Sequence, residues 1–223
     1  MKVVLFGGTG MIGQGALREC LLNPEVTDVL AVVRKAELKP HPKLRELVHP
    51  DFLDFAPVAD TLTGYDACLW CLGITSSGMT EADYTRITYG YTMAAATVLA
   101  ERNPQMTFIF VSGANTDANG KAMWARVKGK AENGVAALPF KAAYMFRPAF
   151  IQPKHGIVSK TKSYRILYVL FTPFVPLLRL LMPAKMTTTE ILGRAMLAVA
   201  KSGAGKSVLE SPDINAIGKS AAA

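Results

Sequence analysis

The stretch of sequence that decides the fold lies at the start of the chain and reads Val3-Val4-Leu5-Phe6-Gly7-Gly8-Thr9-Gly10-Met11-Ile12-Gly13. Its apolar run predicts a strand that leads directly into a glycine-rich turn and then into a helix. Glycines let the backbone come close to a pyrophosphate, and the free N–H groups and dipole of the helix attract anions. The spacing Gly8-x-Gly10-x-x-Gly13 therefore predicts that residues 7–13 bind a dinucleotide. A tight turn with close helix packing is the alternative.

The alternation of short apolar runs with longer helical patterns continues along the chain. We expect strands at residues 3–6, 29–33, 44–48, 67–72, 107–111 and 142–146, and helices near 11–22, 81–102 and 121–138. Strands separated by helices indicate βαβ units and parallel pairing. The sequence predicts an α/β fold, a doubly wound parallel sheet of the Rossmann type, in one domain spanning residues 1–223.

The last third of the chain carries two further helical patterns, near residues 164–181 and 187–200. We expect residues 150–206 to form a small lobe over the carboxyl ends of the strands, where open α/β sheets bind their ligands. Residues 154–185 contain no acidic side chain, and their cationic groups flank an apolar segment. This pattern suits a peripheral membrane contact or a lipid-like substrate with an anionic head. A packed lobe helix and a homodimer face are the alternatives.

Charge and composition narrow the classes of function. The chain has 25 Lys and Arg against 17 Asp and Glu, and half of its residues are hydrophobic, which excludes a disordered protein. The basic excess falls on residues 121–206 and favours an anionic small-molecule substrate or cofactor. Because no nucleic-acid-binding motif accompanies this charge, we do not expect a nucleic-acid partner. The three histidines lack metal-ligand spacing, so no metal site is predicted.

The three cysteines, an odd number, do not predict a disulfide framework. Cys68 and Cys71 have the spacing of a redox C-x-x-C motif, but they fall in an expected strand, where residues three apart point to opposite faces. A structural role is therefore favoured. Together with the absence of a cleavable leader pattern, the cysteines predict a cytoplasmic protein, with membrane association as an alternative.

Two segments bear on the choice of cofactor. Arg34 and Lys35 follow the second expected strand, where an NAD-selective protein usually has an acidic residue. Since an arginine can pair with a 2′-phosphate, NADP is favoured over NAD; a solvated loop charge is the alternative. After the third expected strand, Asp51 and the backbone amide of Phe52 are candidates for holding the adenine edge, although an ordinary turn aspartate fits Asp51 equally well.

Later motifs extend this pattern: Cys71-Leu72-Gly73-Ile74-Thr75, Phe110-Val111-Ser112-Gly113-Ala114, Val127-Lys128-Gly129 and Phe146-Arg147-Pro148. With them, the chain resembles the short-chain dehydrogenase/reductase superfamily over about residues 1–150. It is most similar to the atypical or extended branch, which includes epimerase/dehydratase-like, NmrA-like and Tat-interacting-oxidoreductase-like proteins. The resemblance implies an NAD(P)-binding oxidoreductase or epimerase that acts on a carbonyl compound, with Cys71, Leu72 and Gly73 beside the cofactor. Arg147 is interpreted as a structural residue.

The same resemblance implies a catalytic site with one departure. In the superfamily a serine polarises the carbonyl, a tyrosine transfers the proton, and a lysine four residues later binds the nicotinamide ribose. Ser112 matches the serine and Lys128 the lysine, but Trp124 occupies the tyrosine position. Because an indole N–H exchanges no proton at useful pH, either another group moves the proton or the protein is a catalytically impaired dinucleotide-binding regulator. The candidates for another group are Tyr84, Tyr89, Tyr91, Thr75 and Ser76.

Overall fold

The computed structural model describes residues 1–158 and 182–221. A seven-stranded sheet with the strand order β3-β2-β1-β4-β5-β6-β9 forms its centre, and every neighbouring pair is parallel. Its strands are β1 (Lys2–Phe6), β2 (Asp28–Val33), β3 (Leu44–Val48), β4 (Ala67–Trp70), β5 (Thr107–Val111), β6 (Ala142–Arg147) and β9 (Val208–Glu210). The predicted doubly wound parallel sheet is confirmed. The sequence did not indicate β9, which is only three residues long.

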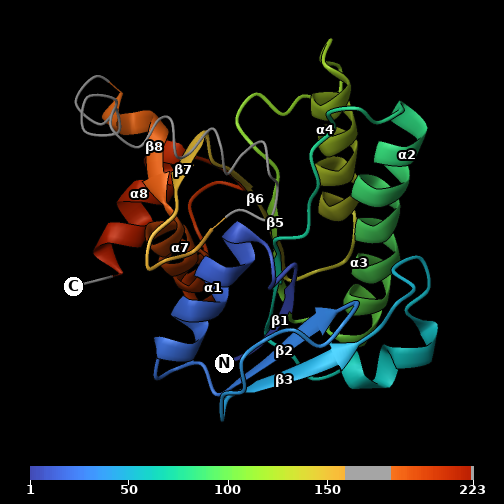
Figure 1. The fold of residues 1–223 in the computed structure, drawn as a ribbon, viewed down its shortest axis with the longest axis vertical. Helices are drawn as coiled ribbons and strands as arrows, with labels where there is room; N and C mark the ends of the chain where they lie inside the picture. Colours follow the sequence, from blue (N-terminus) through green and yellow to red (C-terminus); the bar gives the residue numbers. More distant parts are fainter. Residues whose placement is uncertain (159–181, 222–223) are drawn as a thin grey trace.

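Helices cover both faces of the sheet, as Figure 1 shows. One face carries α1 (Met11–Leu22), α7 (Thr189–Ser202) and α8 (Ser211–Ser220), and the other carries α3 (Tyr91–Arg102) and α4 (Met123–Ala136). Two hydrophobic cores result, one on each side of the sheet. Strand β1 contributes Val3 and Leu5 to the first core and Val4 and Phe6 to the second. Burial on both faces explains why β1 is a continuous apolar run.

The helix expected over residues 81–102 consists of three parts. It begins with α2 (Glu81–Thr85), passes through a π-helical turn at Arg86–Gly90, and continues as α3. Two 3₁₀ segments, Ala56–Leu62 and Pro183–Lys185, complete the described helical structure. None of the helices in residues 1–158 and 182–221 has the length and apolarity that a bilayer span requires.

From its sequence, the helix near residues 187–200 is expected in a small lobe over the carboxyl ends of the strands. The structure gives this helix, α7, a different position. It packs against α1 in the helical layer on the sheet, and Leu192 and Met196 belong to the same core as β1. Two glycines permit this close packing: a Cβ at Gly15 would lie 2.7 Å from Thr189 Cβ, and one at Gly193 would lie 2.8 Å from Glu19 Cγ. The helix near residues 164–181, and most of the basic segment 154–185, fall outside the described residues.

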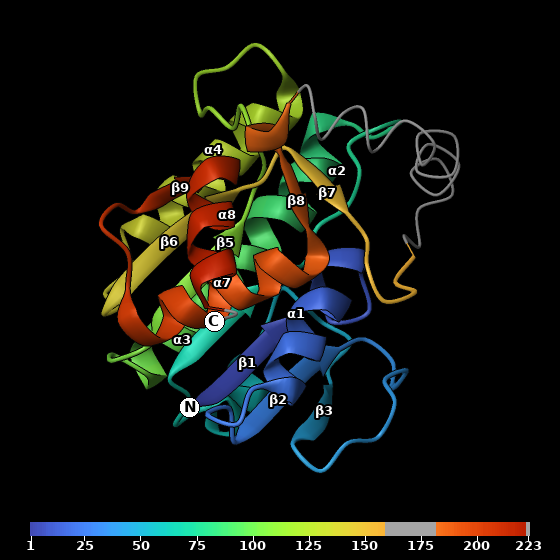
Figure 2. The same cartoon turned by 90° about the vertical axis from the view of Figure 1, so that its left-hand side faces the viewer.

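A second, two-stranded parallel sheet precedes α7. It pairs β7 (Phe150–Gln152) with β8 (Met186–Thr188), and Thr188 then caps α7 by accepting a hydrogen bond from the Ile191 amide. Figure 2 shows the two strands side by side, with β8 leading directly into α7. Neither three-residue strand was expected from the sequence.

The cysteines are free thiols on the two faces of the sheet. Cys68 belongs to the core that faces α3 and α4, whereas Cys71 packs against the core that faces α1 and α7. Burial raises the pKa of both thiols above its ordinary value. The structure confirms that this pair is not arranged as a redox C-x-x-C motif.

Candidate functional site

The turn between β1 and α1 is packed so closely that it leaves no room for side chains at two positions. Gly7 has a φ of +77°, and a Cβ there would lie 2.6 Å from the backbone C of Cys71 and N of Leu72. A Cβ at Gly13 would lie 2.0 Å from the Gly7 carbonyl oxygen. The glycines of this turn therefore let β1, the end of β4 and the start of α1 meet through their backbones.

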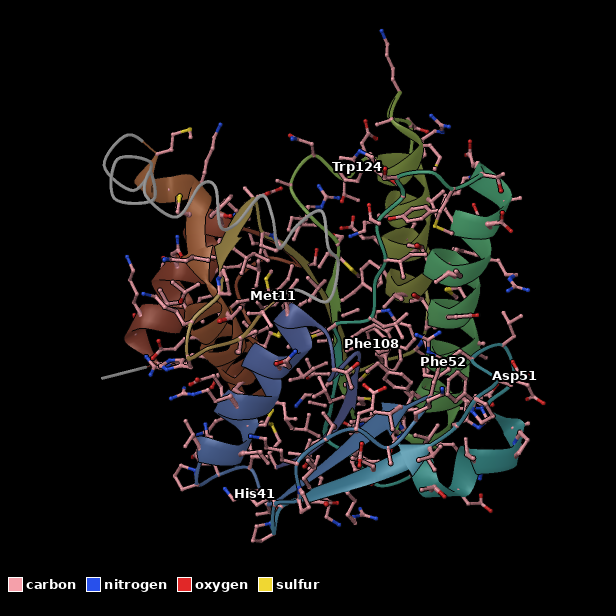
Figure 3. The ribbon with its side chains drawn as sticks, in the orientation of Figure 1. Met11, His41, Asp51, Phe52, Phe108 and Trp124 are labelled. Atoms are coloured by element: carbon pink, nitrogen blue, oxygen red, sulfur yellow. The ribbon has the colours of Figure 1, made fainter. Side chains whose placement is uncertain are left out.

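The N-terminus of α1 presents its amides without a side-chain cap. The helix begins after Gly10, which has no side chain, and its first turn contains no acidic residue. The turn is held by hydrogen bonds from Gly10 N to Gly7 O, 2.9 Å, and from Gln14 Nε2 to Thr9 O, 3.0 Å. Figure 3 shows Met11 at this end of α1, at the carboxyl edge of the sheet. Backbone amides, a helix dipole and a glycine turn that a Cβ would fill fit the pyrophosphate of a dinucleotide.

Arg34 and Lys35 lie where β2 ends at the same edge of the sheet, and both are exposed. The following loop is fixed because the amides of Glu37 and Leu38 both donate to Glu46 Oε1, at 3.1 Å. Leu38 Cδ1 would lie 3.7 Å from a Cβ at Gly8, so this loop rests against the glycine turn. Within the described residues neither cationic side chain forms an ion pair, which leaves both available to an anionic ligand.

Asp51 and Phe52 have structural uses for their side chains. Asp51 Oδ1 accepts a hydrogen bond from the Leu53 amide, 2.9 Å, and so forms a turn. The Phe52 ring is buried, with its centroid 6.2 Å from that of Phe6 and 5.6 Å from that of Phe55. Figure 3 places Asp51 at the periphery, away from Met11 and Trp124. The predicted adenine contact stays a prediction.

The segment after β4 lies directly against the glycine turn. Cys71 N donates to Phe6 O, 3.0 Å, and the Cys71–Leu72 peptide is the group that a Cβ at Gly7 would strike. A Cβ at Gly73 would meet nothing within 4 Å. The raised pKa of Cys71 keeps its sulfur as a thiol, so this segment contributes backbone and shape to the site.

Ser112 and Lys128 meet at the end of β5. The Lys128 ammonium donates to the Ser112 carbonyl oxygen, with an Nζ to O distance of 2.5 Å. Burial lowers the pKa of Lys128 to about 8, and the nearby negative charge of Glu132 opposes this shift. The lysine therefore titrates much closer to neutral pH than an ordinary lysine does.

A buried carboxylate that the sequence analysis missed completes this cluster. Glu132 Oε1 accepts from Ser112 Oγ at 2.5 Å and from Arg147 Nε at 2.9 Å, and its Oε2 accepts from Arg147 Nη2 at 2.5 Å. Glu132 is 4% exposed, so these bonds provide the pairing that a buried charge requires. The structural interpretation of Arg147 is confirmed by this pair. Glu132 lies one helical turn after Lys128, a spacing that could have revealed it.

Trp124 is half-buried in the first turn of α4, one turn before Lys128. Figure 3 shows it at the N-terminal end of α4, which lies on the opposite face of the sheet from α1 and Met11. The β5–α4 loop lies on this helix because Gly129 has no side chain: a Cβ there would be 2.3 Å from the Ala118 amide nitrogen. The helix and loop thus bring Trp124, Ser112 and Lys128 to one edge of the sheet.

The other candidates for proton transfer differ in their surroundings. Tyr84 is buried, and Tyr91 packs against Phe52 with ring centroids 5.7 Å apart. Tyr89 is exposed, and Thr75 Oγ1 accepts from the Ser77 amide at 3.3 Å.

Within residues 1–158 and 182–221, no group of histidine, cysteine and acidic side chains could hold a metal ion.

Comparison with known sequences gives distant relatives. No protein-family model matches the chain. It is 28% identical to "Protein fmp52, mitochondrial" of Emericella nidulans over 157 aligned residues. These residues make up 67% of this chain and 66% of that protein. It is 24% identical over 162 residues to "Protein FMP52, mitochondrial" of Meyerozyma guilliermondii, covering 70% and 69%. The chain thus matches about two thirds of the length of these relatives. Their names overturn the predicted cytoplasmic location, because they place the relatives in the mitochondrion.

Solved structures share the fold. The Bordetella bronchiseptica enzyme WbmH in complex with NAD+ has a TM-score of 0.67 at 17% identity, covering 94% of this chain and 74% of that one. UDP-glucuronic acid 4-epimerase from Bacillus cereus, in complex with NAD, has a TM-score of 0.66 at 13% identity, covering 94% and 76%. A short-chain dehydrogenase/reductase family oxidoreductase from Burkholderia thailandensis has 0.67 at 15%, covering 96% and 92%. The chain has the fold of short-chain dehydrogenase/reductase and NAD-dependent epimerase structures.

Proposed function

We propose that this protein is an NADP-dependent oxidoreductase or epimerase that acts on a carbonyl compound. The observation that carries the proposal is the uncapped N-terminus of α1, set against a turn in which Cβ atoms at Gly7 and Gly13 would collide with backbone. It lies at the carboxyl edge of a parallel sheet, where open α/β folds bind their ligands. The NAD complexes among proteins of the same fold support a nicotinamide dinucleotide as the ligand.

Each part of the dinucleotide has residues that suit it. The amides of residues 8–13 would hold the pyrophosphate, Arg34 with Lys35 the 2′-phosphate, and Lys128 the nicotinamide ribose. The backbone of residues 71–73 would lie beside the nicotinamide, and Trp124 would stack on or cover it. When bound, the dihydronicotinamide ring supplies a hydride to the substrate carbon.

The substrate is expected to be a small or lipid-like carbonyl compound, with an anionic group that suits the basic excess of residues 121–206. Ser112 stands where the resemblance places the ligand of the substrate oxygen. Its hydroxyl donates to Glu132, so its proton is not free for the substrate oxygen, and the donor to that oxygen must be another group.

A second candidate function is supported by Trp124. With an indole at the tyrosine position, the chain would bind the dinucleotide tightly and act on a partner through cofactor occupancy, with no carbonyl reduction. The two functions share the dinucleotide site around α1. They differ in whether a bound carbonyl compound is reduced beside Trp124, in the first turn of α4.

Two measurements on the wild-type protein separate these functions. The first is titration with NADPH and NADH by intrinsic fluorescence, where we expect saturable binding that is tighter for NADPH. The second is single-turnover oxidation of bound NADPH at 340 nm with a carbonyl panel that includes hexanal and methylglyoxal. Substrate-dependent loss of absorbance supports the enzyme, whereas tight binding with no loss for any carbonyl supports the regulator. Failure to bind either dinucleotide would contradict both.

A further inference from the structure

Three residues occupy the positions of the superfamily's catalytic set, and two of them do not offer a free proton in this structure. The Trp124 indole does not exchange its proton at useful pH. The Ser112 hydroxyl proton is already donated to Glu132, a carboxylate that Arg147 holds through two further hydrogen bonds. If Ser112 gave its proton to a substrate, the Glu132 carboxylate would lose one of its three hydrogen bonds in a buried site, which is costly. The third residue, Lys128, remains.

We propose that Lys128 is the proton donor to the substrate oxygen, and that Glu132 is the positioning residue that makes this possible. The proposal rests on the proposed reductase function, with NADPH as the reductant. As the carbonyl carbon is reduced, the π electron pair of the C=O bond moves to oxygen and forms an O–H bond with a proton of Lys128 Nζ. The neutral amine then takes a proton from water, which restores the ammonium.

The geometry around Lys128 Nζ supports this role. The ammonium lies 2.5 Å from the Ser112 carbonyl oxygen, and so stands beside the residue that matches the substrate-oxygen ligand. An ammonium has three protons, so this bond leaves two for other acceptors. Its pKa, lowered by burial to about 8, lies near the range where proton donors work best.

Charged groups on the elements packed around Lys128 influence its pKa. On α4, Glu132 raises the pKa of Lys128, and Arg126 is paired with Glu81 of α2 at 2.8 Å. Arg147 of β6 is paired with Glu132, and Asp117 of the β5–α4 loop acts on Arg147. Removing the Glu132 charge should therefore lower the pKa of Lys128 further below 8.

The first test uses the protein without cofactor or substrate. NMR of 13C-labelled lysine side chains, with the Lys128 signal assigned by its loss in Lys128→Met, should show Lys128 titrating near pH 8. Glu132→Gln should move this titration to lower pH. A lysine that titrates near the ordinary value of about 10.4 would overturn the proposal, and this holds even if Glu132→Gln does not fold.

The second test uses single-turnover reduction at saturating NADPH, so that weaker cofactor binding does not enter the rate. With hexanal or methylglyoxal as probe, whichever is turned over, the wild-type rate should be highest below pH 8 and fall above it as the ammonium loses its proton. Lys128→Met should lower the rate about 10²- to 10⁴-fold. Lys128→Arg keeps a positive charge but does not titrate, so it should lower the rate and remove its fall above pH 8. Lys130→Met, an exposed lysine on the same helix, is the matched control and should leave the rate unchanged.

The outcomes separate this proposal from the function on which it rests. Turnover with an unaltered pH profile in Lys128→Arg would overturn the role of Lys128 alone. The same holds if Tyr84→Phe abolishes the rate while Lys128→Met retains it. Tight NADPH binding without any turnover by the wild-type protein would overturn both the role of Lys128 and the reductase, and would leave the dinucleotide site standing.

Discussion

The turn before α1 and the charged cluster at the end of β5, formed by Ser112, Lys128, Glu132 and Arg147, lie at the same edge of the sheet but are built in opposite ways. The turn works through its backbone, because Gly7 and Gly13 leave no space for a Cβ and Gly10 leaves the helix amides uncapped. The cluster works through side chains, because Glu132 joins Ser112 to Arg147 by three hydrogen bonds. A site of the first kind is damaged by adding an atom, and a site of the second kind by removing a charge.

The largest effect should come from removing the buried carboxylate. Glu132→Ala removes the hydrogen-bonded partner of Arg147 and leaves only the longer contact with Glu210, at 3.9 Å, and breaking such a buried pair typically costs about 3 kcal/mol or more. We expect urea unfolding to show a loss of this size in the free energy of unfolding. Glu25→Ala, which removes a partner from the exposed Lys201–Glu25 pair, should cost less than about 1 kcal/mol. Equal losses for the two variants would contradict the buried network.

Adding one methyl group should have the next largest effect, at the turn. Gly13→Ala gains up to about 1 kcal/mol in helix propensity, but its Cβ would lie 2.0 Å from the Gly7 carbonyl oxygen. The atoms that this Cβ would meet, in Gly7 and Gly8, are all backbone atoms. The turn must therefore move, at a cost of about 1–3 kcal/mol or more. We expect NADPH affinity to fall at least about tenfold, measured by fluorescence titration. Gly205→Ala, where a Cβ meets nothing within 4 Å, is the control. Equal NADPH affinities in the two variants would contradict dinucleotide binding by the turn before α1.

A reversal of charge at the end of β2 should change cofactor preference without disturbing the turn. Arg34→Glu removes a charged hydrogen-bonding partner worth about 1.5–3 kcal/mol from the 2′-phosphate. The ratio of the NADH to the NADPH dissociation constant should therefore fall about 10- to 100-fold. Lys39→Glu makes the same charge change on an exposed residue farther along the loop and should alter the ratio little. If Arg34→Glu leaves the ratio unchanged, the NADP assignment is wrong.

The smallest effect should be a pH-dependent gain in stability. The pKa of Lys128 is lowered from 10.5 to about 8 by burial, so the unfolded state binds more protons than the folded state between these values, and stability rises with pH there. Lys128→Met removes the cost of burying the ammonium. The pKa difference corresponds to about 3 kcal/mol at pH 7, and loss of the hydrogen bond to the Ser112 carbonyl oxygen offsets part of it, so we expect a net stabilisation of roughly 1 kcal/mol that fades as pH rises from 8 toward 10.5. Urea unfolding of both proteins at pH 7 and pH 10 measures this difference, and a constant difference would exclude burial of a charged lysine.

The backbone site was easier to predict from the sequence than the side-chain site. The run Val3–Gly13 fixes strand, turn and helix within one continuous segment, and the structure begins α1 at Met11 as expected. Glu132 was missed because its partners are distant in sequence: Ser112 lies 20 residues and Arg147 15 residues away. Its only local signal was the spacing of four from Lys128.

The C-terminal part was hardest to predict, for reasons of length and packing. The strands β7, β8 and β9 have three residues each, too few for a periodic pattern. Helix α7 was expected in a lobe because its sequence reveals a helix but not its neighbour. The pairing of Gly15 with Thr189, and of Gly193 with Glu19, sets α7 against α1, and only the three-dimensional structure shows that these positions meet.

The most direct test of the central claim, that the turn before α1 binds a nicotinamide dinucleotide, is calorimetric titration of the wild-type protein with NADPH. We expect saturable binding of one NADPH per chain, which weakens at least about tenfold in Gly13→Ala and is retained in Gly205→Ala. No saturable binding of NADPH or NADH by the folded wild-type protein would contradict it.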